Sequence, residues 1–198
     1  MFVKVCGITT PQQAHEISQL VDYVGFIFHP GSPRFVSQSY PSMKAKKVGV
    51  LVNVPLQELI QTALLEKLDS VQLHGSESPE YCAAMKEQVQ VIKSFGVDAD
   101  FDFDQLKAYE PYVDYFLFDT KTPKHGGSGK QFDWRLLKQY QGATPFILSG
   151  GLRPESLPQI QEVNHPKLTG IDLNSGFETQ PGIKNLLLLK QFLHDFHN

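Results

Sequence analysis

The chain has 198 residues, of which 41% are apolar and 20% charged, and its formal net charge is −3. This composition is typical of an ordinary globular domain whose chain is long enough to bury a sizeable core. A mildly acidic chain without a basic block has no electrostatic footprint for a nucleic acid or an anionic membrane surface.

The termini and the cysteines bear on where the protein works. The two cysteines, Cys6 and Cys82, do not make a disulfide framework, and a reducing compartment is the simpler interpretation. The amino-terminus runs directly into strand-like sequence, so we expect no signal peptide. No segment approaches ~20 uninterrupted apolar residues, so we expect no membrane span. The sequence predicts a cytoplasmic protein.

Short apolar runs recur along the chain, with polar stretches of helical character between them. We predict eight strands, at Phe2–Cys6, Tyr23–Phe28, Lys47–Val52, Ser70–His74, Gln90–Phe95, Asp114–Asp119, Thr144–Ser149 and Thr169–Leu173. Their spacing, about one strand plus one helix each, indicates alternating β and α elements.

The segments between the strands carry helix-start signals. Pro11–Leu20 follows Thr9 and Thr10, which can cap a helix, and its proline suits the first turn. Ser78-Pro79-Glu80 and Arg153-Pro154-Glu155 begin helices in the same way, and Leu186–Phe196 is an apolar-rich closing helix. Because there is no linker, low-complexity tract or break in composition, we expect residues 1–198 to form one domain.

Two architectures alternate β and α elements, an open doubly wound sheet and a closed barrel. Open sheets usually have a glycine-rich turn after the first strand, but Gly7-Ile8-Thr9-Thr10 has no G-x-G-x-x-G pattern. The glycine-rich turns instead follow strands six, seven and eight. The sequence therefore favours an α/β fold of the (β/α)8 TIM-barrel type.

Several predicted strands end in polar side chains, where the active sites of such barrels lie. These residues are Cys6, His74, Asp119, Ser149, Asp172 and, just after its strand, Asn174. Parallel barrel strands are buried on both faces and are mostly apolar, so polar residues in them indicate a functional or structural role.

Period-two alternation sorts these residues by face. Asp119 shares a face with Leu117, and Cys6 shares one with Lys4. We expect Cys6, Asp119 and Asp172 to point toward the barrel axis, and Lys4 to fill an inner ionic layer. A buried carboxylate without partners would cost several kcal/mol, so we expect a polar cluster or a ligand at the mouth.

Three glycine-rich segments follow the last three strands. They are His125-Gly126-Gly127-Ser128-Gly129-Lys130, Ser149-Gly150-Gly151 and Asn174-Ser175-Gly176. Glycine lets backbone N–H groups approach an oxyanion closely. Two such turns on the adjacent final strands predict a phosphate site.

These motifs, taken in order, resemble the phosphoribosylanthranilate isomerase family along essentially the whole chain. The matching segments are Lys4–Thr9, Gly25–Phe28, Ser32–Arg34, Val48–Val50, Val71–Gly75, Asp119, Gly126–Gly129, Phe132–Trp134, Ser149–Leu152 and Ile171–Gly176. The resemblance implies an intramolecular oxidoreductase of tryptophan biosynthesis, acting at the third step from chorismate. It would perform an Amadori rearrangement of N-(5-phosphoribosyl)anthranilate to 1-(2-carboxyphenylamino)-1-deoxyribulose 5-phosphate, without metal or organic cofactor.

The resemblance also implies roles for matching residues. Cys6 would be the general base, Asp119 the general acid, and Arg34 the partner of the anthranilate carboxylate. Asp172 would help to orient the substrate. The phosphate would lie at Gly127, Gly129, Gly150, Gly151, Asn174, Ser175 and Gly176. His74 is open between a substrate-binding and a structural role.

The chain departs from the family pattern at three positions. Ser149 stands where alanine is usual, Asn174 where serine is usual, and Asn185 where aspartate is frequent. The first two bear on phosphate affinity, and we expect the third to affect only the start of the last helix.

Two other functions fit such a barrel. An aminosugar phosphate isomerase of the histidine pathway runs the same rearrangement, but that family typically uses two aspartates, is longer and shows an internal repeat. A non-catalytic sugar-phosphate binding protein would keep the glycine turns without the acid–base pair. In each case the partner is a small molecule, with no nucleic acid or membrane, and the chain could be a monomer or a homodimer.

Overall fold

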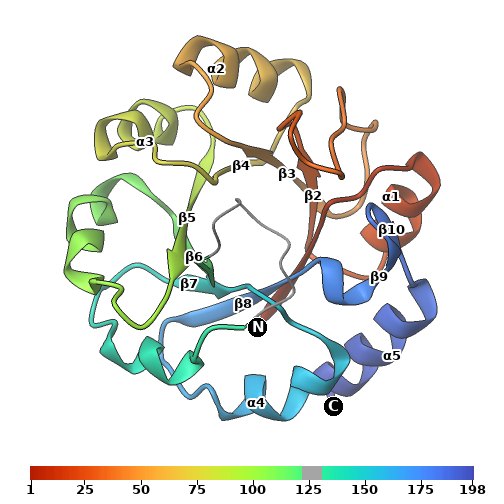
Figure 1. Cartoon of the computed structure of the whole chain (residues 1–198). Helices are drawn as coiled ribbons and strands as arrows, with labels where there is room; N and C mark the ends of the chain where they lie inside the picture. Colours follow the sequence, from red (N-terminus) through yellow and green to blue (C-terminus); the bar gives the residue numbers. More distant parts are fainter. Residues whose placement is uncertain (122–130) are drawn as a thin grey trace.

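The fold is a closed barrel of eight parallel strands in a computed structural model, which describes residues 1–121 and 131–198. The strands follow one another around the barrel from β1 to β8, and β8 pairs with β1 to close it (Figure 1). Helices surround this ring of strands, so the predicted (β/α)8 architecture is confirmed.

The strands lie close to their predicted positions. They are β1 (Phe2–Cys6), β2 (Tyr23–Ile27), β3 (Lys46–Leu51), β4 (Ser70–Leu73), β5 (Gln90–Val97), β6 (Tyr115–Thr120), β7 (Phe146–Leu148) and β8 (Leu168–Leu173). The α-helices are α1 (Pro11–Ser18), α2 (Leu56–Leu65), α3 (Pro79–Lys86), α4 (Leu157–Glu162) and α5 (Leu186–His197). Strand β7 is shorter than the predicted Thr144–Ser149, whereas β5 is two residues longer than predicted.

Side-chain caps begin three of the helices. The Thr10 Oγ1 atom accepts a hydrogen bond from the Gln13 N–H at 3.3 Å, and Ser78 caps α3 in the same way. Asn185 caps α5, because its Oδ1 atom accepts from the Leu188 N–H at 3.1 Å. Such caps satisfy amide groups that lack partners in the first turn. Asn185 thus lies at the start of the last helix, where the sequence predicts its effect.

Among the described residues, three connections of the barrel depart from a regular strand–helix repeat. Between β2 and β3 the chain forms turns and bends without a helix, since Pro30, Gly31, Pro33 and Pro41 interrupt it. Between β5 and β6 the chain forms two 3₁₀ segments, Phe103–Ala108 and Glu110–Tyr112. Between β6 and β7 the described residues form one 3₁₀ segment, Trp134–Gln139. The helical layer is therefore thinner than the sequence pattern predicts.

The buried apolar side chains form two separate clusters. The larger one lies between the strands and the surrounding helices. The smaller one takes one residue from each of five strands, namely Tyr23, Val48, Ile92, Leu117 and Ile147. Because successive strand residues alternate in direction, this second cluster fills the inside of the barrel. The polar residues that come next on the inward faces of the strands lie above this cluster.

A small antiparallel hairpin follows β8 and was not predicted. Its strands are β9 (Glu178–Gln180) and β10 (Ile183–Lys184), and it is reached through a 3₁₀ segment, Ser175–Phe177. The hairpin lies beside α1 (Figure 1). Two hydrogen bonds join Gln13 of α1 to the backbone of Lys184, at 2.8 and 2.9 Å. The hairpin is thus attached to α1, the first helix of the outer layer.

Within the described ranges, none of the helices has the length and apolar character needed to cross a bilayer.

Candidate active site

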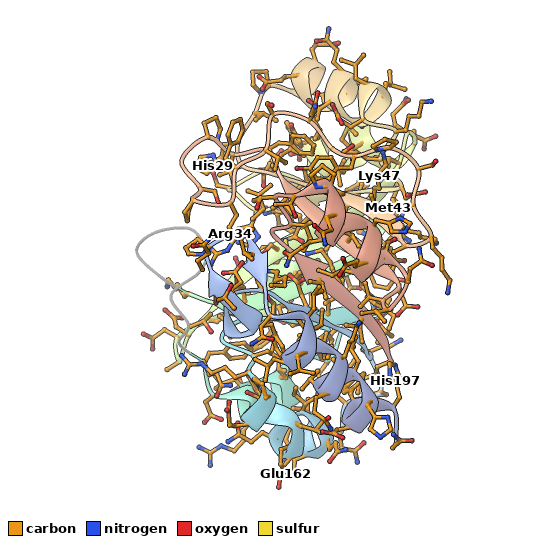
Figure 2. The ribbon with its side chains drawn as sticks, turned by 90° about the vertical axis from the view of Figure 1, so that its right-hand side faces the viewer. His29, Arg34, Met43, Lys47, Glu162 and His197 are labelled. Atoms are coloured by element: carbon orange, nitrogen blue, oxygen red, sulfur yellow. The ribbon has the colours of Figure 1, made fainter. Side chains whose placement is uncertain are left out.

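The polar side chains predicted at the strand ends gather at one end of the barrel. Figure 2 shows Arg34 at this end together with His29, whereas Lys47, at the start of β3, and His197 lie toward the other end. Cys6 ends β1 and Asp119 lies near the end of β6, so both belong to the carboxyl ends of their strands. This is the end at which the loops of such barrels form a binding site.

A buried ion pair joins the first and last strands of the barrel. Lys4 and Asp172 are register neighbours on β1 and β8, and the Lys4 Nζ atom lies 2.9 Å from the Asp172 Oδ1 atom. Lys4 is completely buried. Although burial opposes its charge, the Asp172 carboxylate raises the pKa of Lys4 above its ordinary value. The inner ionic layer predicted for Lys4 is therefore present.

The Cys6 thiol is buried two residues further along the same face of β1. It lies directly over Gly25, because a Cβ atom at position 25 would come within 2.8 Å of the Cys6 Sγ atom. Burial raises the pKa of the Cys6 thiol, while the charges of Lys4 and Lys184 act against this shift. Two cations are thus close enough to stabilise a thiolate, which is the form that acts as a base.

The Asp119 carboxylate sits at the turn that follows β7. Its Oδ1 atom accepts a hydrogen bond from the Thr120 N–H at 2.7 Å. A Cβ atom at Gly150 would come within 2.8 Å of the same oxygen, so the glycine makes room for the carboxylate. Burial raises the pKa of Asp119 to about 6, and the negative charge of Asp172 adds to this shift.

Asp119 and Cys6 share their electrostatic surroundings. The charges of both Lys4 and Asp172 act on the pKa of Asp119 and on that of Cys6. Since these interactions fall off with distance, the two groups lie around the same ion pair. The thiol and the carboxyl group predicted to work together therefore lie at the same end of the barrel.

His74 lies just after β4 and faces Asp119. Its Nε2 atom is 3.7 Å from the Asp119 Oδ2 atom. Its Nδ1 atom is 2.8 Å from the Gln72 Nε2 atom. An amide nitrogen donates, so this contact fits the tautomer in which Nδ1 accepts and Nε2 carries the ring proton, and the roles of the two ring nitrogens depend on that tautomer. In that tautomer, His74 presents an N–H group toward the carboxylate.

The glycine turns after β7 and β8 contact one another. Gly150 and Gly151 both have positive φ angles, of 87° and 68°, which glycine adopts without strain. A Cβ atom at Gly176 would lie 2.1 Å from the Leu152 carbonyl oxygen, so only glycine fits between the two turns. Ser175 lies in the same 3₁₀ segment as Gly176. The predicted residues Gly127 and Gly129 lie outside the described residues.

Arg34 extends over Gly7, immediately after Cys6. A Cβ atom at Gly7 would come within 2.6 Å of the Arg34 Cδ atom. The guanidinium pairs with Glu178 through Nε at 2.9 and 3.1 Å and through Nη2 at 2.6 Å. These hydrogen bonds raise the pKa of Arg34 above its ordinary value. The arginine predicted to bind a carboxylate thus already holds one from the protein.

A second cation holds the same carboxylate. The Lys184 Nζ atom lies 2.6 Å from the Glu178 Oε1 atom and donates to the Asn174 Oδ1 atom at 2.7 Å. Burial favours the neutral acid, but Arg34 and Lys184 hold the pKa of Glu178 below its ordinary value. The Asn174 side chain, predicted to lie near a phosphate, is engaged in this network.

Glu178 and Lys184 were missed at the level of sequence. Two short runs separated by Pro181-Gly182 are a recognisable hairpin signal. That signal could have predicted the hairpin, although not the pairing of its residues with Arg34, which lies 144 residues away from Glu178.

As for metals, the described residues contain no group of three or more His, Cys, Asp or Glu side chains that could hold an ion. What the site offers is proton transfer and anion binding. Asp119, with a pKa of about 6, can donate a proton near neutral pH. Cys6 can accept one as a thiolate, and Arg34 can bind an anion.

Comparisons with known proteins agree on one family. A family model described as N-(5'phosphoribosyl)anthranilate (PRA) isomerase matches residues 3–195. An N-(5'-phosphoribosyl)anthranilate isomerase from Parabacteroides distasonis is 45% identical, over 98% of this chain and 92% of the relative.

Two crystal structures of phosphoribosyl anthranilate isomerases are also similar, each with a TM-score of 0.83 and 32% identity over 100% of this chain and 98% of theirs. One is a complex with reduced 1-(o-carboxyphenylamino)-1-deoxyribulose 5-phosphate. The other concerns monomers generated from the dimeric enzyme of Thermotoga maritima.

Proposed function

Because the chain belongs to the N-(5'-phosphoribosyl)anthranilate isomerase family, we propose that Cys6 and Asp119 perform the proton transfers of this family's reaction. The chain is an isomerase of tryptophan biosynthesis. It converts N-(5-phosphoribosyl)anthranilate to 1-(2-carboxyphenylamino)-1-deoxyribulose 5-phosphate by an Amadori rearrangement. The observation that carries the proposed roles is the convergence of a thiol and a protonatable carboxyl group around the Lys4–Asp172 ion pair.

The rearrangement needs an acid first. Asp119 donates its proton to the furanose ring oxygen, the bond from that oxygen to carbon 1 breaks, and an imine forms. A pKa of about 6 suits this step, because a useful fraction of the carboxyl group is protonated near neutral pH. The burial that raises this pKa also keeps bulk water away from the imine.

The rearrangement then needs a base. The Cys6 thiolate removes the proton from carbon 2, and the electron pair moves to give an enolamine, which tautomerises to the ketone. The charges of Lys4 and Lys184 favour the thiolate. Since the thiol pKa is nevertheless raised by burial, only a minor fraction of the free protein carries the thiolate at neutral pH.

Other site residues hold the two anionic ends of the substrate. Arg34 binds the anthranilate carboxylate through the part of its guanidinium that Glu178 does not occupy. The backbone at Gly150, Gly151, Ser175 and Gly176 binds the phosphate, together with Gly127, Gly129 and Asn174. Asp172 and His74 orient the sugar between these ends. The contact between the turns after β7 and β8 supports this arrangement.

The rival functions are not favoured. A histidine-pathway isomerase is expected to carry an aspartate where this chain has Cys6. A non-catalytic binding barrel has no need of a buried carboxyl group whose pKa is raised toward neutrality.

Two further assignments are proposals of the same kind. A cytoplasmic location fits the two free, buried cysteines, which a reducing compartment preserves. A homodimer is the arrangement suggested by the Thermotoga maritima relative, and sedimentation at several protein concentrations distinguishes it from a monomer.

The function is tested by following the loss of phosphoribosylanthranilate fluorescence, with the unstable substrate generated in situ. We expect turnover by the purified chain, and complementation of a strain that lacks the tryptophan-pathway isomerase. A chain that binds the substrate without consuming it would contradict the function and favour the binding-protein alternative.

A further inference from the structure

The guanidinium of Arg34 has two usable edges, and the protein occupies only one of them. Arginine carries five N–H donors in a planar fork, which can pair side-on through Nε and one Nη, or end-on through both Nη atoms. Glu178 takes the side-on edge through Nε and Nη2. Among residues 1–121 and 131–198, no acceptor is bonded to Nη1. The end-on edge remains for a ligand.

The carboxylate that holds Arg34 is itself held in place. Lys184 lies directly opposite Glu178 in the β9–β10 hairpin, and its Nζ atom bonds the Glu178 Oε1 atom at 2.6 Å. The backbone of Lys184 is in turn bonded twice to Gln13 of α1. The Gly182 N–H also donates to Glu178 Oε1, at 3.1 Å. Glu178 therefore cannot turn without breaking its hydrogen bonds to Arg34, Gly182 and Lys184.

The network is buried and carries a surplus of positive charge. The side chains of Arg34, Glu178 and Lys184 are 10%, 5% and 0% exposed. Two cations surround one carboxylate, so a second carboxylate from a ligand meets a net positive charge. Because the geometry is set before binding, little conformational entropy is lost when the ligand arrives.

We propose that the β9–β10 hairpin sets the substrate specificity of the site, because Glu178, held by Lys184, turns the end-on edge of the Arg34 guanidinium toward the ring carboxylate. Glu178 is thus a positioning residue that acts through Arg34. The inference rests on the proposed role of Arg34 as the partner of the anthranilate carboxylate.

The test compares two substrates, prepared by condensing ribose 5-phosphate with anthranilate or with aniline. They differ only in the ring carboxylate. For Glu178→Gln we expect KM for the anthranilate-derived substrate to rise about tenfold or more, since one charged hydrogen-bonding pair is lost. We expect kcat to change by less than about threefold, and kcat/KM for the aniline-derived substrate to be unchanged.

The ratio of the two kcat/KM values separates positioning from a general structural role. A damaged fold lowers both values together, whereas a misdirected guanidinium lowers only the one that depends on the carboxylate. The matched control is Asp133→Asn, because Asp133 pairs with Arg135 in the same side-on geometry, but at an exposed site. That variant should keep the wild-type ratio.

The possible failures can be told apart. If the wild type has no turnover, or if Arg34→Ala keeps the preference for the carboxylate, the proposed function or the role of Arg34 fails. If Arg34→Ala loses the preference while Glu178→Gln keeps it, the positioning role of Glu178 is overturned.

A second measurement serves if Glu178→Gln does not fold. In Arg34→Ala, free guanidinium should bind Glu178 and restore kcat/KM for the anthranilate-derived substrate in a saturable way. Methylammonium, a cation without the planar fork, should not. Equal rescue by both ions, or by neither, would count against the inference.

Discussion

His74 Nε2 lies 3.7 Å from Asp119 Oδ2, while the other ring nitrogen of His74 is 2.8 Å from the Gln72 amide. The pKa of Asp119 is raised to about 6 because burial outweighs the hydrogen bond from the Thr120 N–H, which favours the carboxylate.

Removal of either proton-transfer group should abolish turnover without abolishing binding. Cys6→Ala and Asp119→Ala should each lose nearly all kcat, since neither residue is proposed to hold an anionic end of the substrate. Stopped-assay kinetics and calorimetric titration with the product measure the two properties separately. The matched control is Cys82→Ser, which changes the other buried thiol and should lower stability but not kcat per folded molecule. Near-normal turnover in either alanine variant would contradict the assigned roles.

The pH profile of kcat/KM should bend near pH 6. The productive form carries a proton on Asp119 and none on Cys6, and this combination of protonation states is a minority at every pH. Its fraction still falls as pH drops below the lower pKa, that of Asp119 at about 6, and as pH rises above the thiol pKa. We therefore expect a plateau between these limits and a tenfold loss per pH unit on the acidic side.

The substrate phosphate also titrates near pH 6, so the acidic limb needs a control. Carbon-13 NMR of aspartate-labelled free protein, compared with Asp119→Asn, reports the carboxyl group alone. A resonance that titrates near pH 4 in place of pH 6 would overturn this assignment.

Asp119 should also make stability depend on pH. Its pKa rises from an ordinary value of 3.8 to about 6 on folding, so the folded state binds this proton more tightly. The stabilisation is fully present below about pH 4 and is lost as pH rises through 6. Above that range, ionised Asp119 costs the folded state about 3 kcal/mol relative to a neutral group.

Asp119→Asn removes this titration. The free energy of unfolding of the variant minus that of the wild type should increase by about 2 kcal/mol between pH 4.5 and pH 8, because about 1 kcal/mol of the full effect is already present at pH 4.5. Urea unfolding at a series of pH values measures the difference. A difference that does not change with pH would show that Asp119 is not held in an unfavourable environment.

A second buried ion pair, outside the proposed site, should matter for stability alone. The Lys93 Nζ atom lies 3.1 Å from Glu77 Oε2, and both side chains are almost fully buried. Glu77 Oε1 also accepts from the backbone of Asn53 at 2.8 Å and of Gly75 at 3.2 Å, so the pair ties together the turns after β3 and β4.

Lys93→Met leaves an uncompensated buried carboxylate and should cost about 3–5 kcal/mol of the free energy of unfolding. The double variant Lys93→Met/Glu77→Gln should recover part of this loss, since the remaining charge is then removed. Chemical denaturation measures both variants. Equal destabilisation in the single and double variants would mean that packing of the lysine stem, and not its charge, is what the site needs.

Much of the barrel could be predicted because its information is local. Strand positions follow from short apolar runs, and period-two alternation placed Cys6 and Lys4 on one face and Asp119 on the inner face of β6. The same reasoning found Asp172, since a carboxylate in a buried strand needs a partner. The absence of a helix between β2 and β3 could have been predicted from the three prolines in that segment.

What the sequence did not reveal depends on contacts between distant segments. Arg34 follows β2 and Glu178 follows β8, the two strands that flank β1 in the barrel, and no sequence periodicity predicts their pairing. The choice between α and 3₁₀ geometry after β5 depends on how each segment packs on the barrel. The hydrogen bond from Lys184 to the Asn174 side chain depends on the register of the hairpin.

The ion pair between Lys4 and Asp172 has a consequence for the order of assembly. Its members are 168 positions apart and belong to the first and last strands, so it exists only once the ring is complete. During synthesis, Cys6 emerges early together with Lys4, but it gains Asp172 and Lys184 as charged neighbours only when β8 and the hairpin have left the ribosome. Contacts of such high sequence separation form slowly, so catalytic competence should be among the last properties a nascent molecule gains.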